Sequence, residues 1–191
     1  MAPIVVVPDQ LGDPGQNPMC VDGPLGNSAG YLTEDVPEWV RRHLPVSADR
    51  ADWAIAGFSQ GGTCALQLAA GFPDLFGSFL DISGERAPTL GSERATIERG
   101  FGGDEDAYRA ATPRALLEAA APYPDTAALF VAGERDLKYS AAMREVSRQA
   151  AAAGMAVTVL VAPGTAHDWN TARYGFREGF ERLLPRWGIT R

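Results

Sequence analysis

The chain of 191 residues is long enough for one domain with a substantial buried core. Its formal net charge of -7, without a basic stripe, argues against binding to nucleic acid or to an anionic membrane surface. No apolar run approaches the roughly 18 residues that span a bilayer, and residues 1–8 lack the features of a signal peptide.

The first part of the chain predicts two strands and two helices. The β-branched run at residues 4–7 predicts a buried strand, and the Gly- and Pro-rich residues 9–30 predict a long loop. Apolar residues at helical spacing predict a helix over residues 31–43. A second strand is expected at residues 53–56, followed by an Ala- and Leu-rich helix over residues 60–70.

The second part continues this alternation after an excursion. In chain order we expect a strand at 78–82, a strand at 127–132, a helix over 137–153, a strand at 156–161 and a closing helix over 168–184. Residues 86–124 are expected to form a loop-and-helix excursion above the sheet, with a helix that Thr112 caps before Pro113. Strands that alternate with helices predict an α/β fold, a mainly parallel sheet of about five strands flanked by helices, in one domain over residues 1–191.

The pentapeptide Gly-Phe-Ser-Gln-Gly at residues 57–61 follows a predicted strand and opens a predicted helix. Glycines in such a turn let the strand and the helix approach each other, and the turn points the serine side chain away from the core. The N–H of the next residue, Gln60, then faces the oxyanion that develops during acyl transfer. The pattern predicts Ser59 as a catalytic nucleophile.

The chain has two histidines, of which one suits the role of general base. His43 lies before the nucleophile at a predicted helix end, where a surface position is expected. His167 follows the last predicted strand, where this type of fold places its base. We therefore predict that His167 accepts the proton of the nucleophile.

Several carboxylates lie between the nucleophile and the predicted base. Asp136 follows the fourth predicted strand, at the sheet edge where the other two residues are expected, and is the favoured acid. Glu134 is its near neighbour and a weaker candidate. Asp81 and Glu85, on or just after the third strand, remain alternatives.

These motifs resemble the esterase D-type branch of the α/β hydrolases, which also contains the mycobacterial mycolyltransferases. The resemblance rests on Val-Val-Pro-Asp at 6–9, Tyr-Leu-Thr-Glu-Asp-Val-Pro at 31–37, Gly-Phe-Ser-Gln-Gly-Gly at 57–62, Phe-Pro-Asp-Leu-Phe at 72–76 and Pro-Gly-Thr-Ala-His-Asp-Trp at 163–169. It implies a serine esterase or acyltransferase that needs no metal or organic cofactor, with Ser59, Asp136 and His167 as its triad. Because mycolyltransferases use a glutamate as the acid, Glu134 stays open.

Cys20 and Cys64 are the two cysteines of the chain. They are too few for a zinc site with paired-cysteine spacing, and their number alone leaves both a disulfide and two buried thiols open. Many relatives carry cysteines near these positions and work outside the cytoplasm. The resemblance thus gives weight to a disulfide and to an extracytoplasmic or secreted location.

The chain departs from the family at its front, because relatives carry further strands before the Val-Val-Pro-Asp motif. One of these strands normally lies beside the strand of the nucleophile. We expect residues 4–7 to move inward and pair with residues 53–56, which would make the N–H of Gln10 or Leu11 the second oxyanion donor. Alternatively, another chain supplies the strand, as in a homodimer, or the chain is a shortened product of a longer protein.

Three functions are compatible with these residues. The leading one is hydrolysis of a small-molecule or lipid acyl ester through an acyl-enzyme. The second is acyl transfer to a carbohydrate or lipid hydroxyl, which differs only in the acceptor. The third is an α/β domain with weak or no catalysis that binds a ligand.

Overall fold

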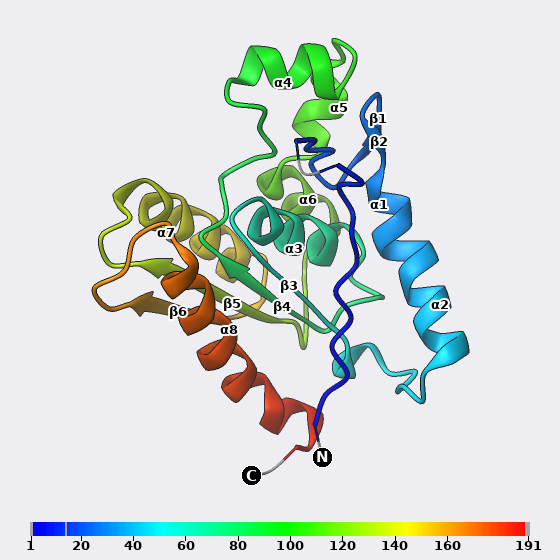
Figure 1. Ribbon diagram of the computed structural model, residues 1–191, viewed down its shortest axis with the longest axis vertical. Coiled ribbons are helices and arrows are strands. Elements are labelled where there is room, and N and C mark those ends of the chain that lie inside the picture. Colours follow the sequence, from blue (N-terminus) through cyan, green and yellow to red (C-terminus); the bar gives the residue numbers. More distant parts are fainter. Residues whose placement is uncertain (1, 14, 190–191) are drawn as a thin grey trace.

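A parallel four-stranded sheet forms the centre of the computed structural model, which describes residues 2–13 and 15–189 (Figure 1). The strands lie in the order β3-β4-β5-β6, with bounds Ala54–Phe58, Ser78–Ile82, Ala127–Gly133 and Ala156–Ala162. All three neighbouring pairs are parallel. The predicted α/β class with a mainly parallel sheet is therefore confirmed, with four strands in this sheet instead of about five.

The helices follow the predicted alternation, with ends that shift by a few residues. They are α1 Ser28–Gly30, a π-helical turn Tyr31–Asp35, α2 Val36–His43, α3 Gln60–Gly71, α4 Glu93–Gly100, α5 Glu105–Ala110, α6 Pro113–Ala120, α7 Leu137–Ala152 and α8 Trp169–Leu183. Short 3-10 turns occupy Arg50–Asp52 and Leu184–Trp187. The predicted loop at residues 9–30 also contains a small hairpin of β1 (Asp22–Gly23) and β2 (Gly26–Asn27).

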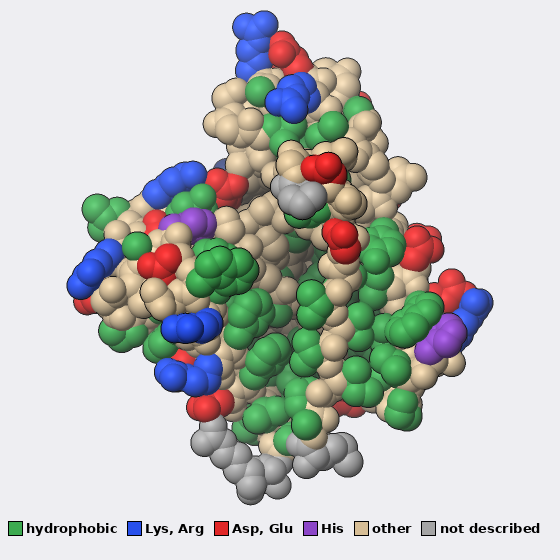
Figure 2. Space-filling view, in the orientation of Figure 1, with side chains coloured by type: hydrophobic (Ala, Val, Ile, Leu, Met, Phe, Trp, Pro, Cys, Tyr) green, Lys and Arg blue, Asp and Glu red, His purple; other side chains and the backbone are tan. Residues whose placement is uncertain are grey.

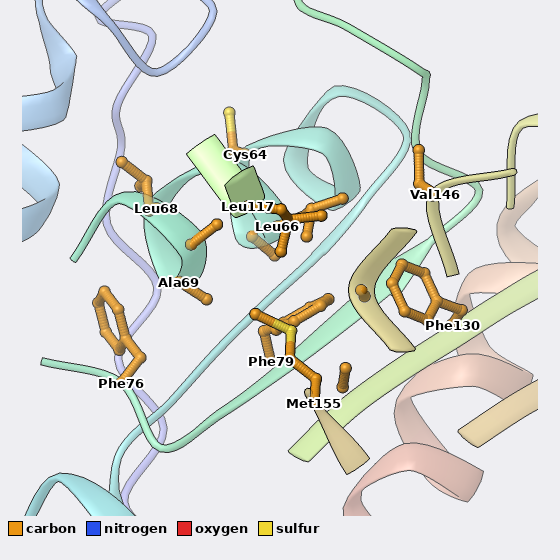
Figure 3. Close-up of a cluster of buried hydrophobic side chains, with 14 of the residues drawn as sticks. Cys64, Leu66, Leu68, Ala69, Phe76, Phe79, Leu117, Phe130, Val146 and Met155 are labelled. Atoms are coloured by element: carbon orange, nitrogen blue, oxygen red, sulfur yellow. The ribbon is translucent and has the colours of Figure 1, made fainter. Parts of the chain in front are cut away.

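Two helical layers cover the sheet. On one face, side chains of α3, α6 and α7 pack with alternate residues of the strands, including Phe79 and Phe130, as Figure 3 shows. On the other face, Leu80 and Ile82 pack with α8. This alternation along β4 is the two-residue period of a strand whose faces are both buried.

Glycines let α8 approach the sheet closely. A β-carbon at Gly179 would lie 2.6 Å from a side-chain carbon of Leu80, and one at Gly175 would lie 2.8 Å from Ile82. Helix α8 starts directly after the loop that carries the predicted base, so its close packing fixes that loop relative to the sheet.

The excursion between β4 and β5 carries α4, α5 and α6. In Figure 1 the first two of these helices project beyond the sheet, near the β1–β2 hairpin, whereas α6 lies closer to α3. Thr112 accepts a hydrogen bond from the Ala115 N–H and caps α6, with Pro113 as the first helical residue, as the sequence predicts.

The predicted strand at residues 4–7 is wrong. These residues form no strand in the described chain, and β3 has β4 as its one strand neighbour in the sheet. Their side chains are exposed, from 40% at Val6 to 88% at Val7. Figure 2 shows hydrophobic side chains gathered on the face of the molecule where Figure 1 draws this N-terminal segment. A β-branched run favours a strand, but it does not specify the partner with which that strand would pair.

Candidate active site

Ser59 occupies a strained turn between β3 and α3. Its backbone has φ 58° and ψ −118°, a region that residues other than glycine seldom adopt. The Ser59 N–H donates to the Ile82 carbonyl oxygen at 2.8 Å, which ties the turn to the end of β4. A β-carbon at Gly57 would lie 2.2 Å from the Gly61 backbone, so the turn requires glycine at position 57.

Three predicted side chains meet at the carboxyl edge of the sheet. His167 Nε2 lies 2.9 Å from Ser59 Oγ, and His167 Nδ1 lies 3.1 Å from Asp136 Oδ2. If Nδ1–H donates to the carboxylate, Nε2 is left to accept the serine proton. The Asp136 side chain is 7% exposed and that of His167 is 30% exposed. The base is therefore reachable from solvent, whereas the acid behind it is covered.

Backbone contacts hold the loops of the acid and the base together. The Arg135 N–H donates to the Thr165 carbonyl oxygen at 2.9 Å. Gly133 lies so close to the other loop that a β-carbon there would be 2.6 Å from the Ala166 carbonyl oxygen. These contacts fix the distance between the ends of β5 and β6, so the acid and the imidazole are placed by rigid elements.

Asp168 follows His167 in the chain and caps the N-terminus of α8. Its carboxylate accepts hydrogen bonds from the Thr171 and Asn170 N–H groups, which lower the pKa of Asp168 below its usual value. Asp168 therefore stays ionised at neutral pH and holds the start of α8, while Asp136 is the carboxylate in contact with His167.

Two aromatic rings lie against the imidazole of His167. The Tyr139 ring is stacked on it with centroids 3.8 Å apart, and the Phe58 ring is stacked at 4.9 Å. Sequence reasoning did not assign either ring to the site. Their positions were nonetheless a usable signal, because Phe58 precedes the predicted nucleophile and Tyr139 lies one helical turn after the predicted acid.

A disulfide joins Cys20 to Cys64 and anchors the N-terminal loop to α3. It decides between the two alternatives that the cysteine count left open. The Gln60 amide nitrogen lies 3.1 Å from the sulfur of Cys64, and Gln10 Nε2 donates to Gln60 Oε1 at 3.0 Å. Gln10 is thus placed beside the residue that follows Ser59, although residues 4–7 do not pair with β3.

The two predicted second oxyanion donors differ in their surroundings. The Leu11 N–H donates to Asp9 Oδ1 at 3.2 Å, within a local turn. The Gln10 side chain reaches Gln60. Gln60 is the first residue of α3, and the first N–H groups of a helix have no carbonyl partner within the helix. The Gln60 N–H is therefore available to bind an anion.

The remaining titratable candidates lie in other environments. Glu134 is exposed and accepts a backbone N–H from the loop after β6. Glu85 accepts from Lys138 Nζ at 3.1 Å, and His43 is exposed at the end of α2.

Among the described residues, no group of three or more His, Cys, Asp or Glu side chains could hold a metal ion, and no helix could cross a membrane.

Asp81 is buried within β4, and within the described part of the chain it makes no hydrogen bond to the imidazole. Burial raises the pKa of Asp81 to about 7, and a hydrogen bond from the Gly84 N–H opposes this shift. A β-carbon at Gly62, in the first turn of α3, would lie 2.5 Å from Asp81 Oδ1. Asp81 therefore sits beneath the serine turn, in the core.

Comparison with known proteins adds a family model and a relative. The model described as "Putative esterase" matches residues 27–183. An uncharacterized protein of Corynebacterium glutamicum is 36% identical over 194 residues. That match covers 99% of this chain and 45% of the relative, so the chain spans less than half of the relative's length.

Solved structures share the fold at low sequence identity. An S-formylglutathione hydrolase from Agrobacterium tumefaciens superposes with a TM-score of 0.72 at 20% identity, over 89% of this chain and 63% of that one. MPT51 (FbpC1) of Mycobacterium tuberculosis superposes with a TM-score of 0.63 at 17% identity, over 91% of this chain and 73% of that one. FphF, a fluorophosphonate-binding serine hydrolase of Staphylococcus aureus, superposes with a TM-score of 0.69 at 19% identity. This match covers 83% of this chain and 64% of that one. At these identities the structures establish the α/β-hydrolase fold.

Proposed function

Because the chain belongs to the esterase family, we propose that it hydrolyses carboxylic esters through Ser59, His167 and Asp136. The observation that carries the proposal is the contact of both ring nitrogens of His167, 2.9 Å from Ser59 Oγ on one side and 3.1 Å from Asp136 Oδ2 on the other. This geometry suits removal of the serine proton and stabilisation of the imidazolium that results.

The reaction proceeds through an acyl-enzyme. Ser59 Oγ attacks the ester carbonyl carbon while its proton moves to His167 Nε2, and a tetrahedral oxyanion forms. His167 then gives that proton to the departing alcohol as the carbon–oxygen bond breaks. Water repeats the sequence on the acyl-enzyme, releases the carboxylic acid and returns the proton to Ser59 through His167.

The Gln60 N–H is the first donor to the oxyanion in this proposal. It lies at the start of α3, where the helix dipole also favours negative charge. Of the two predicted second donors, the Leu11 N–H is engaged with Asp9, so we propose the Gln10 N–H for this role.

We propose a small-molecule or lipid acyl ester as the substrate. An exposed aromatic side chain lies near His167: Trp169 is 74% exposed, and its ring centroid lies 5.7 Å from that of Phe58, which stacks on the imidazole. An apolar acyl or alcohol group would cover the Trp169 ring and remove it from water. Two of the proteins with the same fold are an S-formylglutathione hydrolase and a ferulic acid esterase.

Turnover of a p-nitrophenyl acyl ester tests the proposal. We expect Ser59→Ala to lower kcat by about four orders of magnitude or more, because no nucleophile remains. Ser47→Ala, at an exposed serine outside the site, is the matched control and should retain wild-type kcat. Equal rates for the wild type and Ser59→Ala would exclude Ser59 as the nucleophile.

Covalent labelling separates catalysis from ligand binding alone. A fluorophosphonate reacts with a serine that a base has activated, so it should label the wild type and leave Ser59→Ala unlabelled. An unlabelled wild type would instead favour the catalytically weak α/β binding domain.

We also propose that the protein works outside the cytoplasm. The Cys20–Cys64 disulfide supports this location, because disulfides persist in oxidising compartments. Thiol blocking at cell lysis, followed by reduction and a mass-shift label, should show both cysteines oxidised. Two free thiols in the protein taken from its native host would argue for a reducing compartment.

A further inference from the structure

The imidazole of His167 contacts two aromatic rings, Tyr139 and Phe58, in addition to its two hydrogen-bond partners. We propose that Tyr139 is a positioning residue that holds the plane of the His167 ring in line with Ser59 and Asp136. The inference rests on the proposed function, since it concerns proton transfer between these three residues.

The ring geometry shows how the imidazole is held. The Tyr139 ring lies 3.8 Å from it with an interplanar angle of 19°, and the Phe58 ring lies 4.9 Å away at 29°. Both rings are therefore close to parallel with the imidazole and cover its faces, not its edges. Since the described chain shows no ring contact between Tyr139 and Phe58, we infer that they lie on opposite faces.

The two hydrogen bonds alone leave the His167 ring free to rotate about one axis. The bonds to Ser59 and Asp136 hold the two nitrogens, but the ring can still tilt about the line that joins them. Because the Nε2 lone pair lies in the ring plane, such a tilt turns it away from the serine proton. Stacked rings on both faces oppose the tilt and keep the lone pair directed at Ser59.

Tyr139 is itself fixed by the same residues that it supports. Its N–H donates to Asp136 Oδ1 at 3.2 Å, in the first turn of α7. Lys138 Nζ lies 4.6 Å from the centroid of the Tyr139 ring and donates to Glu85 Oε1, on the segment after β4. One residue thus contacts the acid through its backbone and the base through its ring.

Tyr139 is a better test position than Phe58, because Phe58 belongs to the serine turn. Replacing the Tyr139 side chain keeps the backbone N–H that bonds Asp136, so the acid stays in place. Tyr139→Phe keeps the stacked ring and removes the hydroxyl. Tyr139→Leu fills the space with an apolar side chain that has no flat face.

The experiment compares kcat and KM of these two variants on a p-nitrophenyl acyl ester. We expect Tyr139→Phe to retain kcat within about twofold and Tyr139→Leu to lower kcat about tenfold, the size of one aromatic contact. KM should change less than about threefold in both, because substrate binding does not use the ring in this proposal. A fall in kcat at unchanged KM in Tyr139→Leu, restored in Tyr139→Phe, is the result that separates positioning of the base from a general loss of packing.

The matched control is Phe180→Leu in α8. It removes a stacked pair of similar kind, Phe176 and Phe180 with centroids 6.0 Å apart, that does not contact His167. We expect wild-type kcat for this variant. If Tyr139→Leu melts below the assay temperature, Tyr139→Met takes its place, since a flexible side chain fills the same space.

Wild-type kcat in Tyr139→Leu, or an equal loss in Tyr139→Phe and Tyr139→Leu, would overturn the positioning role. The second result would assign the effect to the hydroxyl group. Failure of the function itself looks different, because Ser59→Ala would then turn over substrate like the wild type.

Discussion

Asp81 is a single buried carboxyl group that makes stability depend on pH. Burial raises the pKa of Asp81 from the usual 3.8 of an aspartate to about 7. Between these two values the folded state holds a proton that the unfolded state has released, so the free energy of unfolding falls as pH rises through this range. The stabilisation is complete below about pH 4 and lost above about pH 7, and it amounts to roughly 4 kcal/mol.

Urea unfolding at pH 4 and pH 8 checks this expectation. Asp81→Asn keeps the acceptor for the Gly84 N–H but does not ionise, so the fall in unfolding free energy should be smaller in this variant by about 4 kcal/mol. Asp74→Asn, at an exposed position, should follow the wild type. An identical pH dependence in the wild type and Asp81→Asn would show that Asp81 titrates normally.

The N-terminal loop and α3 are two elements that one disulfide holds together. The disulfide joins Cys20 and Cys64, which are 44 residues apart in the sequence, and so closes a long loop. A bond over such a loop restricts the unfolded chain and should contribute about 4 kcal/mol to stability on the chain-entropy estimate. We therefore expect dithiothreitol to lower the free energy of unfolding by that amount.

The same reduction should lower catalysis, because it loosens the loop that places Gln10 beside Gln60. At a dithiothreitol concentration where the protein remains folded, kcat should fall several-fold. The double variant Cys20→Ser, Cys64→Ser is the control and should not respond to dithiothreitol. Unchanged kcat and unchanged unfolding in reduced wild type would show that the loop is held by its other contacts.

One face of the whole molecule carries exposed apolar side chains (Figure 2). The side chains of Ile4, Val5 and Val7 are each more than half exposed, and β3 has no strand on its outer edge in the described chain. Exposed edges and apolar patches favour association with another chain. The net charge of -7 opposes this association through repulsion between molecules.

We expect this chain to self-associate as its concentration and the salt concentration rise. Salt screens the repulsion while the apolar contact remains. Light scattering after size exclusion, at 50 mM and 500 mM NaCl, should show a mass that grows with both variables. Val5→Lys with Val7→Lys should keep the protein monomeric. A monomeric wild type at high salt and high concentration would contradict this expectation and the homodimer considered from the sequence.

The sequence by itself determined the features that local patterns encode. The alternation of apolar runs predicted the α/β class, and glycine spacing predicted the serine turn at 57–61, which the positive φ of Ser59 bears out. The order of Ser59, Asp136 and His167 along the chain predicted that they would meet. Each of these inferences depends on residues close together in the chain, or on the rule that parallel strands end at one edge of the sheet.

Only the tertiary structure decided which partners distant segments choose. It placed Asp136 rather than Glu134 on the imidazole, formed the Cys20–Cys64 disulfide and left residues 4–7 unpaired. It also set Tyr139 against His167. These outcomes depend on distances between segments that lie tens of residues apart, and a β-branched run or a carboxylate has the same local pattern whether or not a partner lies within reach.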